Sequence, residues 1–451
     1  MALTGVEIFK LLPKTNCKKC GYPTCLAFAM KLAQRQASLD QCPDISEEAK
    51  RILGEASAPP IRPITLGIGD KAVKLGEETV LFRHEKKFVN PCAFAVEVKD
   101  SMSDNEINKI VDDVLNSEID RVGQKLRIDA IFVNNTSNDV GRFEAVVKAV
   151  AAKAPAVPLI IATSNPAGAE AALKVASDKK PLLYGADESN LEAMANVAKT
   201  YKVSLGVIAK GLDALSALTE KIKGLGVEDM VIDSGARSAK EILEANTFIR
   251  RAAIKKNFKT LGYPVITFAQ RDDKMLEALI ATLGVAKYAS IIVLSSIEKW
   301  KNLALFTLRQ NIYTDPQVPM QVEQKIYKIG EPTPDSPLAI TTNFSLTYFI
   351  VSGEIENSKV PTRLAVMDCE VLSILTAWAA GKFTASKIAQ FIKESGIENE
   401  IKHRELIIPG YVAILSGSIE EKLPGWKVTV GPREANGLPV FLRARAAQVN
   451  Q

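Results

Sequence analysis

Residues 94–115 read FAVEVKDSMSDNEINKIVDDVL, and this stretch contains the repeating unit that decides the fold of the chain. Its first five residues form a short, mostly apolar run with the length of a buried strand. The remainder repeats apolar residues at three- and four-residue spacing, as on one face of a helix: Ile107, Ile110, Val111, Val114 and Leu115. The stretch therefore predicts a strand followed by an amphipathic helix.

The same unit recurs along the middle of the chain. Short apolar runs occur at 94–98, 129–133, 159–162, 182–184, 204–208, 230–233, 265–269 and 291–294. Eight such units match the number and size of a (β/α)8 barrel, also called a TIM barrel. An open doubly wound sheet is the alternative, but that fold usually has fewer strands and a glycine-rich first turn. We therefore expect a TIM barrel over residues 93–315.

Polar residues follow several of these predicted strands, at the end of the barrel where active sites lie. They are Asp100, Asn134, Asn135, Ser164, Asn165, Asp233, Gln270, Arg271 and Asp272. The set contains neither a histidine–carboxylate pair nor a metal-binding triad. We therefore expect the barrel to be a scaffold more than a catalyst.

Four of the six cysteines lie close together near the N-terminus. Residues 17–25 read CKKCGYPTC, and Cys42 follows after sixteen further residues, directly before Pro43. Four thiolates at this spacing suit an iron–sulfur cluster with Cys17, Cys20, Cys25 and Cys42 as its ligands. A short helix over 26–36 is predicted between the third and the fourth ligand.

Two other uses of these cysteines compete with a cluster. Zinc sites usually contain paired C-x2-C knuckles, and the second pair is missing here. Disulfides need an oxidising compartment, and nothing in the sequence indicates export. The pattern therefore favours a cluster, and with it electron transfer to a recipient that the motif does not identify.

Proline-rich stretches divide the chain into domains. One lies at 58–63, and a second, at 316–337, contains five prolines. The predicted organisation is a cluster domain at 1–58, a linker with short strands (64–68 and 79–82) at 59–92, the barrel at 93–315, a linker at 316–337 and an α/β domain at 338–451.

The last domain predicts a compact α/β unit. Strands are expected at 338–342, 348–351, 364–367, 406–408 and 428–430, and helices at 372–380 and 385–393. Thr384 is placed to cap the second helix and Gly396 to end it. Small residues at the predicted turns would let backbone amides approach a large flat or phosphorylated ligand, although ordinary turns explain them equally well.

The composition excludes several classes of protein. The 451 residues include 57 basic and 52 acidic side chains, and a net charge of +5 is too small to indicate nucleic-acid binding. The first residues lack the apolar core of a signal peptide, and no apolar run is long enough to span a membrane. We expect a cytoplasmic protein.

Together with the cysteine motif, five C-terminal stretches resemble the large (gamma) subunit of corrinoid iron–sulfur proteins. They are TTNFSLTY at 341–348, MDCEVLSILTAWAAGK at 367–382, LIIPG at 406–410, LPGW at 423–426 and VGPR at 430–433. The resemblance covers essentially the whole chain, in the order cluster domain, barrel and corrinoid domain.

The resemblance implies a methyl carrier of the reductive acetyl-CoA (Wood–Ljungdahl) pathway of anaerobes. A base-off cobamide on a Rossmann-like C-terminal domain would accept a methyl group from methyltetrahydrofolate and donate it to the nickel site of acetyl-CoA synthase. A 4Fe–4S cluster would return cob(II) to cob(I). The implied partners are the small (delta) subunit as a heterodimer, methyltetrahydrofolate methyltransferase, acetyl-CoA synthase/carbon monoxide dehydrogenase and a low-potential electron donor.

The resemblance also implies which residues hold the cobamide. The corrin face would lie over a helix start formed by Leu372, Ser373, Ile374, Leu375 and Thr376. The corrin side chains and nucleotide tail would contact Thr342, Asn343, Tyr348, Gly410, Gly431, Pro432, Arg433 and Asn436. The only histidines are His84 and His403, and neither lies in a cobalt-ligand motif, so no protein ligand to cobalt is expected.

Two other functions remain open at this point. The chain could be an iron–sulfur methyltransferase that binds a pterin in the mouth of its own barrel. It could also be an electron-transfer subunit with no organic cofactor. Cobalt content and the need for a separate methyltransferase would distinguish the three hypotheses.

Overall fold

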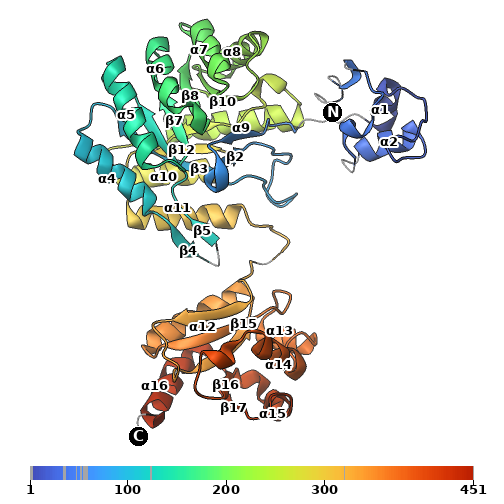
Figure 1. The fold of residues 1–451 in the computed structure, drawn as a ribbon, viewed down its shortest axis with the longest axis vertical. Helices are drawn as coiled ribbons and strands as arrows, with labels where there is room; N and C mark the ends of the chain where they lie inside the picture. The colour runs from blue at the N-terminus through green and yellow to red at the C-terminus, as the bar shows by residue number, and fades with distance from the viewer. Residues whose placement is uncertain are drawn as a thin grey trace. The chain divides into compact units, whose positions relative to one another are not determined.

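The computed structural model describes residues 4–33, 37–46, 48–50, 53, 59–121, 124–318 and 320–449. The chain forms two compact units, one of Met1–Glu118 with Arg127–Tyr313 and one of Ile119–Leu126 with Thr314–Gln451. Figure 1 shows the elements of each unit. Among the described residues, no helix combines the length and the apolar character needed to cross a membrane.

Eight parallel strands form a nearly closed barrel in the first unit. Their order is β10-β9-β8-β7-β6-β3-β12-β11, and a single parallel bridge between Ile232 and Val265 joins the two ends. The strands are β3 (Ala93–Lys99), β6 (Ala130–Asn134), β7 (Leu159–Ala162), β8 (Leu182–Ala186), β9 (Ser204–Ile208), β10 (Met230–Asp233), β11 (Ile266–Phe268) and β12 (Ile291–Leu294). All eight predicted strands are present, and the predicted barrel is confirmed.

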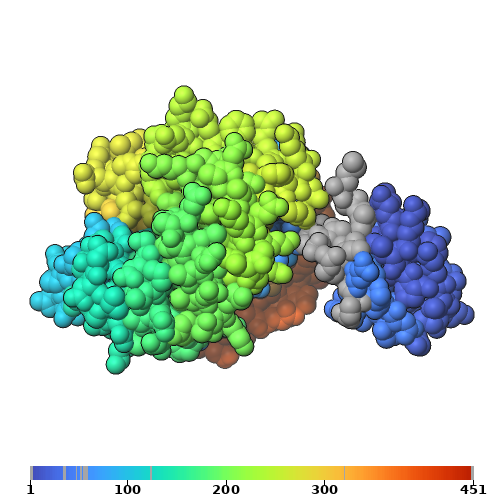
Figure 2. All heavy atoms as spheres, turned by 90° about the horizontal axis from the view of Figure 1, so that it is seen from above, coloured from blue at the N-terminus to red at the C-terminus, as the bar shows by residue number. Residues whose placement is uncertain are grey.

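A helix follows each barrel strand along the chain. These helices are α4 (Asp104–Leu115), α5 (Val140–Lys153), α6 (Pro166–Ala176), α7 (Leu191–Tyr201), α8 (Leu212–Gly224), α9 (Ala239–Lys255), α10 (Lys274–Ala286) and α11 (Lys299–Ile312). Figure 2 shows those in green and yellow as a continuous outer surface of the barrel. The first of them begins with a capping box, in which Ser103 and Glu106 bind each other's backbone N–H groups.

Side chains fill the inside of the barrel. Phe132, Tyr184 and Phe268 pack against one another there, with ring centroids 5.4 to 5.7 Å apart. The hairpin of β1 (Ile64–Leu66) and β2 (Val73–Leu75) adds Leu66 and Leu75 to the same core. The barrel is therefore a packed core and not a pore.

The strand predicted at 79–82 is absent, and this prediction was wrong. Side chains satisfy the backbone of this segment instead of a neighbouring strand. Arg250 donates two hydrogen bonds to the Val80 carbonyl, and the Glu85 carboxylate accepts from the N–H groups of Leu81 and Phe82. An apolar run with such partners does not need to join a sheet.

A five-stranded sheet is the centre of the second unit. Its order is β13 (Lys325–Ile329), β15 (Thr362–Met367), β14 (Leu338–Thr342), β16 (Glu405–Ile408) and β17 (Lys427–Val430). Only β13 is antiparallel, and it lies inside the proline-punctuated segment 316–337. The unit also contains a hairpin of β4 (Ile119–Arg121) and β5 (Gln124–Leu126). Among the parallel strands the chain order reverses between β14 and β16, which in open α/β sheets is where ligands bind.

Residues 348–351 are helical, so the strand predicted there was wrong. They belong to α12 (Ser345–Ser358), which connects β14 to β15. These two strands are parallel neighbours, and a parallel pair needs a crossover connection, usually a helix. This tertiary requirement overrides the β-branched and aromatic character of the segment.

The other helices of the second unit follow the sequence more closely. They are α13 (Ile374–Ala379), α14 (Ala385–Glu394), α15 (Ser416–Lys422) and α16 (Leu438–Val449). As predicted, the Thr384 hydroxyl caps α14, here by accepting from the Lys387 N–H, and Gly396 adopts a left-handed conformation after the helix.

The N-terminal part contains α1 (Gly5–Leu11) and α2 (Cys25–Ala33), which pack against each other. Ile8, Leu12 and Phe28 lie in a small core of their own. The helix predicted at 26–36 is confirmed as far as Ala33; residues 34–36 lie outside the described residues.

Candidate functional site

The four N-terminal cysteines surround this small core with different exposures. Cys17 is exposed, Cys20 is half-buried, and Cys25 and Cys42 are buried. Cys25 begins α2, where its N–H donates to the Asn16 side-chain oxygen at 2.8 Å, and the Asn16 N–H lies 3.4 Å from its sulfur. Cys42 follows a short 3-10 turn, Leu39–Gln41. All four are free thiols.

The structure brings these thiols into one neighbourhood. Burial raises the pKa of Cys42, and the charges of Cys20, Cys17 and Cys25 raise it further. In the described part of the chain, no three His, Cys, Asp or Glu side chains converge closely enough to bind one metal ion. A cluster of several iron atoms is larger than a single ion, so its thiolates stand further apart. The arrangement of the thiols therefore fits a polynuclear cluster.

A cavity of about 310 Å3 opens in the second unit at the carboxyl ends of β14 and β16. It lies at the point where the chain order of the sheet reverses. Its lining is mostly apolar, as in pockets for organic cofactors. Six of the residues that the resemblance implied contribute to the lining: Ser373, Ile374, Leu375, Gly431, Pro432 and Arg433.

Two glycines allow the backbone to pass very closely at one wall of this cavity. A Cβ atom on Gly410 would lie 2.6 Å from the Gly431 carbonyl oxygen and 2.8 Å from the Arg433 nitrogen. The Gly410 N–H donates to the Pro432 carbonyl, and the Gly431 N–H to the Ile408 carbonyl. Gly410 therefore shapes the wall although it does not line the cavity itself.

Two buried threonine hydroxyls at the end of β14 have no hydrogen-bond partner among the described residues. They belong to Thr341 and Thr342. Thr341 lines the cavity and Thr342 does not. An unsatisfied buried hydroxyl in a cavity indicates a polar group that is supplied by a ligand. The sequence pointed to Thr342 and missed Thr341, because a parallel strand is buried on both faces and gives no alternation to distinguish them.

The other implied residues lie beside the cavity. Asn343 organises the loop after β15: its oxygen accepts from Cys369 N and Val371 N, and its amide donates to Asp368. Tyr348 packs on Tyr327, and Leu372 packs against the core. The list is completed by Thr376, whose hydroxyl lies 3.1 Å from that of Ser373, and by Asn436 in the turn Ala435–Gly437.

Exposed apolar side chains surround the cavity. Leu375 and Tyr411 line it and remain 45% and 42% exposed, and Ile414 on the same turn as Tyr411 is 77% exposed. Apolar groups left open to solvent around a cavity indicate that something apolar covers them. The rim is therefore suited to a large ligand whose smaller part enters the cavity.

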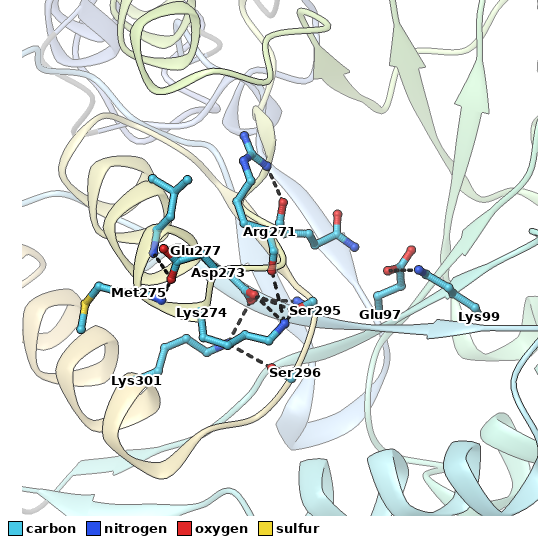
Figure 3. A network of polar contacts seen from close by, with 12 residues as sticks. Glu97, Lys99, Arg271, Asp273, Lys274, Met275, Glu277, Ser295, Ser296 and Lys301 are labelled. Atoms are coloured by element: carbon cyan, nitrogen blue, oxygen red, sulfur yellow. Dashed lines mark hydrogen bonds and ion pairs between the residues drawn. The ribbon is translucent and has the colours of Figure 1, made fainter.

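The strand-end residues of the barrel bind one another. Asp100 accepts four hydrogen bonds from Thr136 and Ser137, and Asp233 accepts from Tyr184 and Arg237. Figure 3 shows a third network, in which Glu277, Ser295, Lys301 and Lys274 point toward one another. These side chains have internal partners, which supports the interpretation of the barrel as a scaffold.

The comparisons with known proteins agree with both sites. The family model described as "CO dehydrogenase/acetyl-CoA synthase delta subunit" matches residues 63–442, and a model described as "Putative Fe-S cluster" matches residues 12–43. The "Corrinoid/iron-sulfur protein large subunit" of Moorella thermoacetica is 46% identical over 447 residues, which cover 99% of this chain and 100% of that protein. The chain belongs to the corrinoid iron–sulfur protein large-subunit family.

Archaeal members of this family are named for a different complex. The "Acetyl-CoA decarbonylase/synthase complex subunit gamma" of Methanothermobacter thermautotrophicus is 34% identical over 99% of this chain and 100% of that protein. The subunit of the same name from Archaeoglobus fulgidus is 36% identical over 97% of each chain. The family model carries the delta-subunit name, but these relatives also cover the cysteine region and are large or gamma subunits. We therefore assign the chain to the large subunits.

Proposed function

We propose that this large subunit is a methyl carrier that holds a base-off cobamide on its second unit and a 4Fe–4S cluster on its N-terminal cysteines. The observation that carries the proposal is the cavity at the carboxyl ends of β14 and β16, with the unsatisfied hydroxyl of Thr341 in its lining. Family membership supplies the class of ligand. The second unit would then be a Rossmann-like cobamide domain.

The residues of the cavity fit the chemistry of a cobamide. Its nucleotide tail is slender and polar, and Thr341, Ser373 and Arg433 offer it hydroxyl and guanidinium donors. The corrin ring is broad and largely apolar, and the exposed side chains of Leu375 and Tyr411 offer it a matching surface. The lining contains no histidine, which fits a cobalt without a protein ligand.

A bound cobamide would supply the metal centre that accepts a methyl group from methyltetrahydrofolate, through a separate methyltransferase, and donates it to acetyl-CoA synthase. The protein contributes binding and orientation. The close contact of Gly410 and Gly431 keeps one wall rigid, and Asn343 holds the loop after β15 in place. None of the proposed contacts is a proton donor or acceptor for the transferred group, so we assign no catalytic residue to this chain.

A 4Fe–4S cluster would supply the single electron that returns oxidised cobalt to its reactive state. Cys17, Cys20, Cys25 and Cys42 would be its ligands. Asn16 accepts a hydrogen bond from the backbone of one of them, Cys25, and so orients the start of α2. The proposed partners are the delta subunit, the methyltransferase, acetyl-CoA synthase/carbon monoxide dehydrogenase and a low-potential electron donor.

Metal and cofactor analysis of the anaerobically purified complex tests the proposal directly. We expect bound corrinoid and about four iron atoms for each large subunit. Absence of cobalt after expression with cobamide supplied would favour an electron-transfer subunit. Methylation at full rate without an added methyltransferase would favour a methyltransferase that binds its pterin in the barrel.

A cysteine variant tests the division of labour between the two cofactors. Cys42→Ala should abolish reductive reactivation but leave methyl transfer from pre-reduced protein almost unchanged. Cys92→Ala is the matched control, because Cys92 is a buried thiol of the barrel outside the motif. Equal loss of both activities in Cys42→Ala would show that the cluster is structural or directly catalytic.

A further inference from the structure

The proposed cluster would reach the surface on one side only. Of its four ligands, Cys17 alone is exposed, Cys20 is half-buried, and Cys25 and Cys42 are buried in the small core. Electron tunnelling weakens steeply with distance, so a protein that exchanges electrons with the cluster gains most by docking over Cys17. The chemistry of the surface around this residue therefore decides which proteins dock there.

This surface is strongly basic. Residues 10–25 contain Lys10, Lys14, Lys18 and Lys19 and no acidic residue, and all four lysines are exposed. The one carboxylate that reaches the group is Asp44, which pairs with Lys19 at 3.0 Å. Among the described residues, neither Lys14 nor Lys18 forms an ion pair. We call Lys14, Lys18 and Lys19 the lysine collar.

The loop that carries the collar is tightly wound. Lys14, Asn16 and Lys18 all adopt left-handed backbone conformations, with φ of 61°, 48° and 62°. Such conformations are costly for residues other than glycine and persist only where the surroundings enforce them. Asn16 is held by its two contacts with Cys25, and Lys14 lies over the ring of Phe9 at 5.9 Å. The loop therefore holds two positive charges on either side of Cys17.

We propose that the lysine collar is the docking surface for an acidic one-electron carrier protein. This inference rests on the proposed cluster and adds the place and the charge of its electron donor. One electron passes from the reduced carrier to the oxidised cluster, and no bond or proton moves. Complementary charge speeds the encounter of such partners and makes it sensitive to salt, while the contact itself stays small and short-lived.

Two simpler explanations compete with docking. Exposed lysines are often only a solvated face, and lysines near a cluster also offset the negative charge of its thiolates. The first explanation predicts no effect of charge reversal on the rate of electron transfer. The second predicts an equal effect on every reductant, because it acts on the cluster and not on the encounter. A comparison of two reductants separates both from docking.

The experiment uses the full chain in complex with its partner subunit, reduced in a stopped-flow instrument. The protein reductant is a reduced acidic ferredoxin, and the small one is a cationic viologen radical. We compare wild type with Lys14→Glu/Lys18→Glu and with Lys31→Glu as the matched control. Lys31 is exposed in the same small domain and lies six residues beyond Cys25 on α2, about 9 Å further along the helix axis.

We expect the double variant to be reduced by ferredoxin at least tenfold more slowly at low salt, and to lose the salt dependence that wild type shows. Reduction by viologen should stay within about twofold, and Lys31→Glu should resemble wild type. Calorimetric titration with oxidised ferredoxin should show the same loss of binding, independently of turnover. Unchanged ferredoxin rates, or equal losses with both reductants, would overturn the docking proposal. Iron content is measured first, and wild type without iron would overturn the proposed cluster itself.

Discussion

The Lys301 ammonium lies 3.0 Å from the Glu277 carboxylate, and both side chains are fully buried in the barrel unit (Figure 3). Ser295, just beyond β12, donates its N–H and its hydroxyl to the same carboxylate. One buried carboxylate thus connects α10, α11 and the end of β12. The pair lies among the strand-end residues that bind one another, and its role is structural.

Breaking this pair should destabilise the barrel strongly. Lys301→Met leaves the carboxylate of Glu277 buried without its counter-charge, which should lower the free energy of unfolding by about 3–5 kcal/mol. Urea unfolding followed by circular dichroism measures the loss. Lys299→Met on the exposed side of α11 is the control and should change stability by less than about 0.5 kcal/mol. A small effect of Lys301→Met would show that water reaches the carboxylate.

The same carboxylate predicts a dependence of stability on pH. Burial raises the pKa of Glu277, but hydrogen bonds from Ser295 and Lys301 outweigh it and hold the pKa below the ordinary value of 4.5. The folded-state pKa is thus the lower one, so the contribution is complete above about pH 4.5 and is lost as the pH falls through the folded-state value. Urea unfolding between about pH 6 and pH 3 should show a shallower decline for Glu277→Gln than for wild type. Parallel declines would contradict this assignment.

The close approach at the cavity wall predicts that Gly410 does not tolerate a side chain. The Cβ atom of Gly410→Ala meets backbone atoms, which cannot move aside as a flexible side chain would. We expect a loss of about 1–3 kcal/mol in stability together with weaker corrinoid retention. Gly417→Ala is the control: it lies in α15 with open space around it and should be neutral or slightly stabilising. Full corrinoid retention by Gly410→Ala would separate this wall from the cofactor site.

The unsatisfied hydroxyl of Thr341 predicts a separation of stability from binding. Thr341→Val removes a buried hydroxyl that has no protein partner, so the protein without cofactor should not lose stability. If this hydroxyl binds the cobamide, corrinoid affinity should fall about two- to tenfold, the equivalent of one hydrogen bond. Thr342→Val is a close control, since Thr342 is equally buried and unsatisfied but does not line the cavity. Equal affinity losses in both variants would place the ligand elsewhere.

Patterns local in sequence predicted most of the barrel and the candidate cluster ligands. Apolar runs separated by helical stretches were sufficient for eight strands, because a parallel strand covered on both faces is continuously apolar. The helix at Thr384 was equally predictable, since its cap and its apolar face both lie within its own residues. The cysteine motif depends only on spacing, because nearby ligands of one cluster must come from one short loop.

Tertiary structure decided the elements whose partners lie far away in the chain. Residues 348–351 resemble a strand and fold as a helix, because β14 and β15 became parallel neighbours that need a crossover. Residues 79–82 form no strand, because Arg250 reaches their backbone from α9. The choice between Thr341 and Thr342 as the cavity-facing hydroxyl was likewise invisible in a strand that is buried on both sides. The sequence by itself thus determined the barrel, the candidate cluster ligands and the family, whereas only the packing of distant segments created the cavity, because its walls come from β14, β16 and the turn after β17.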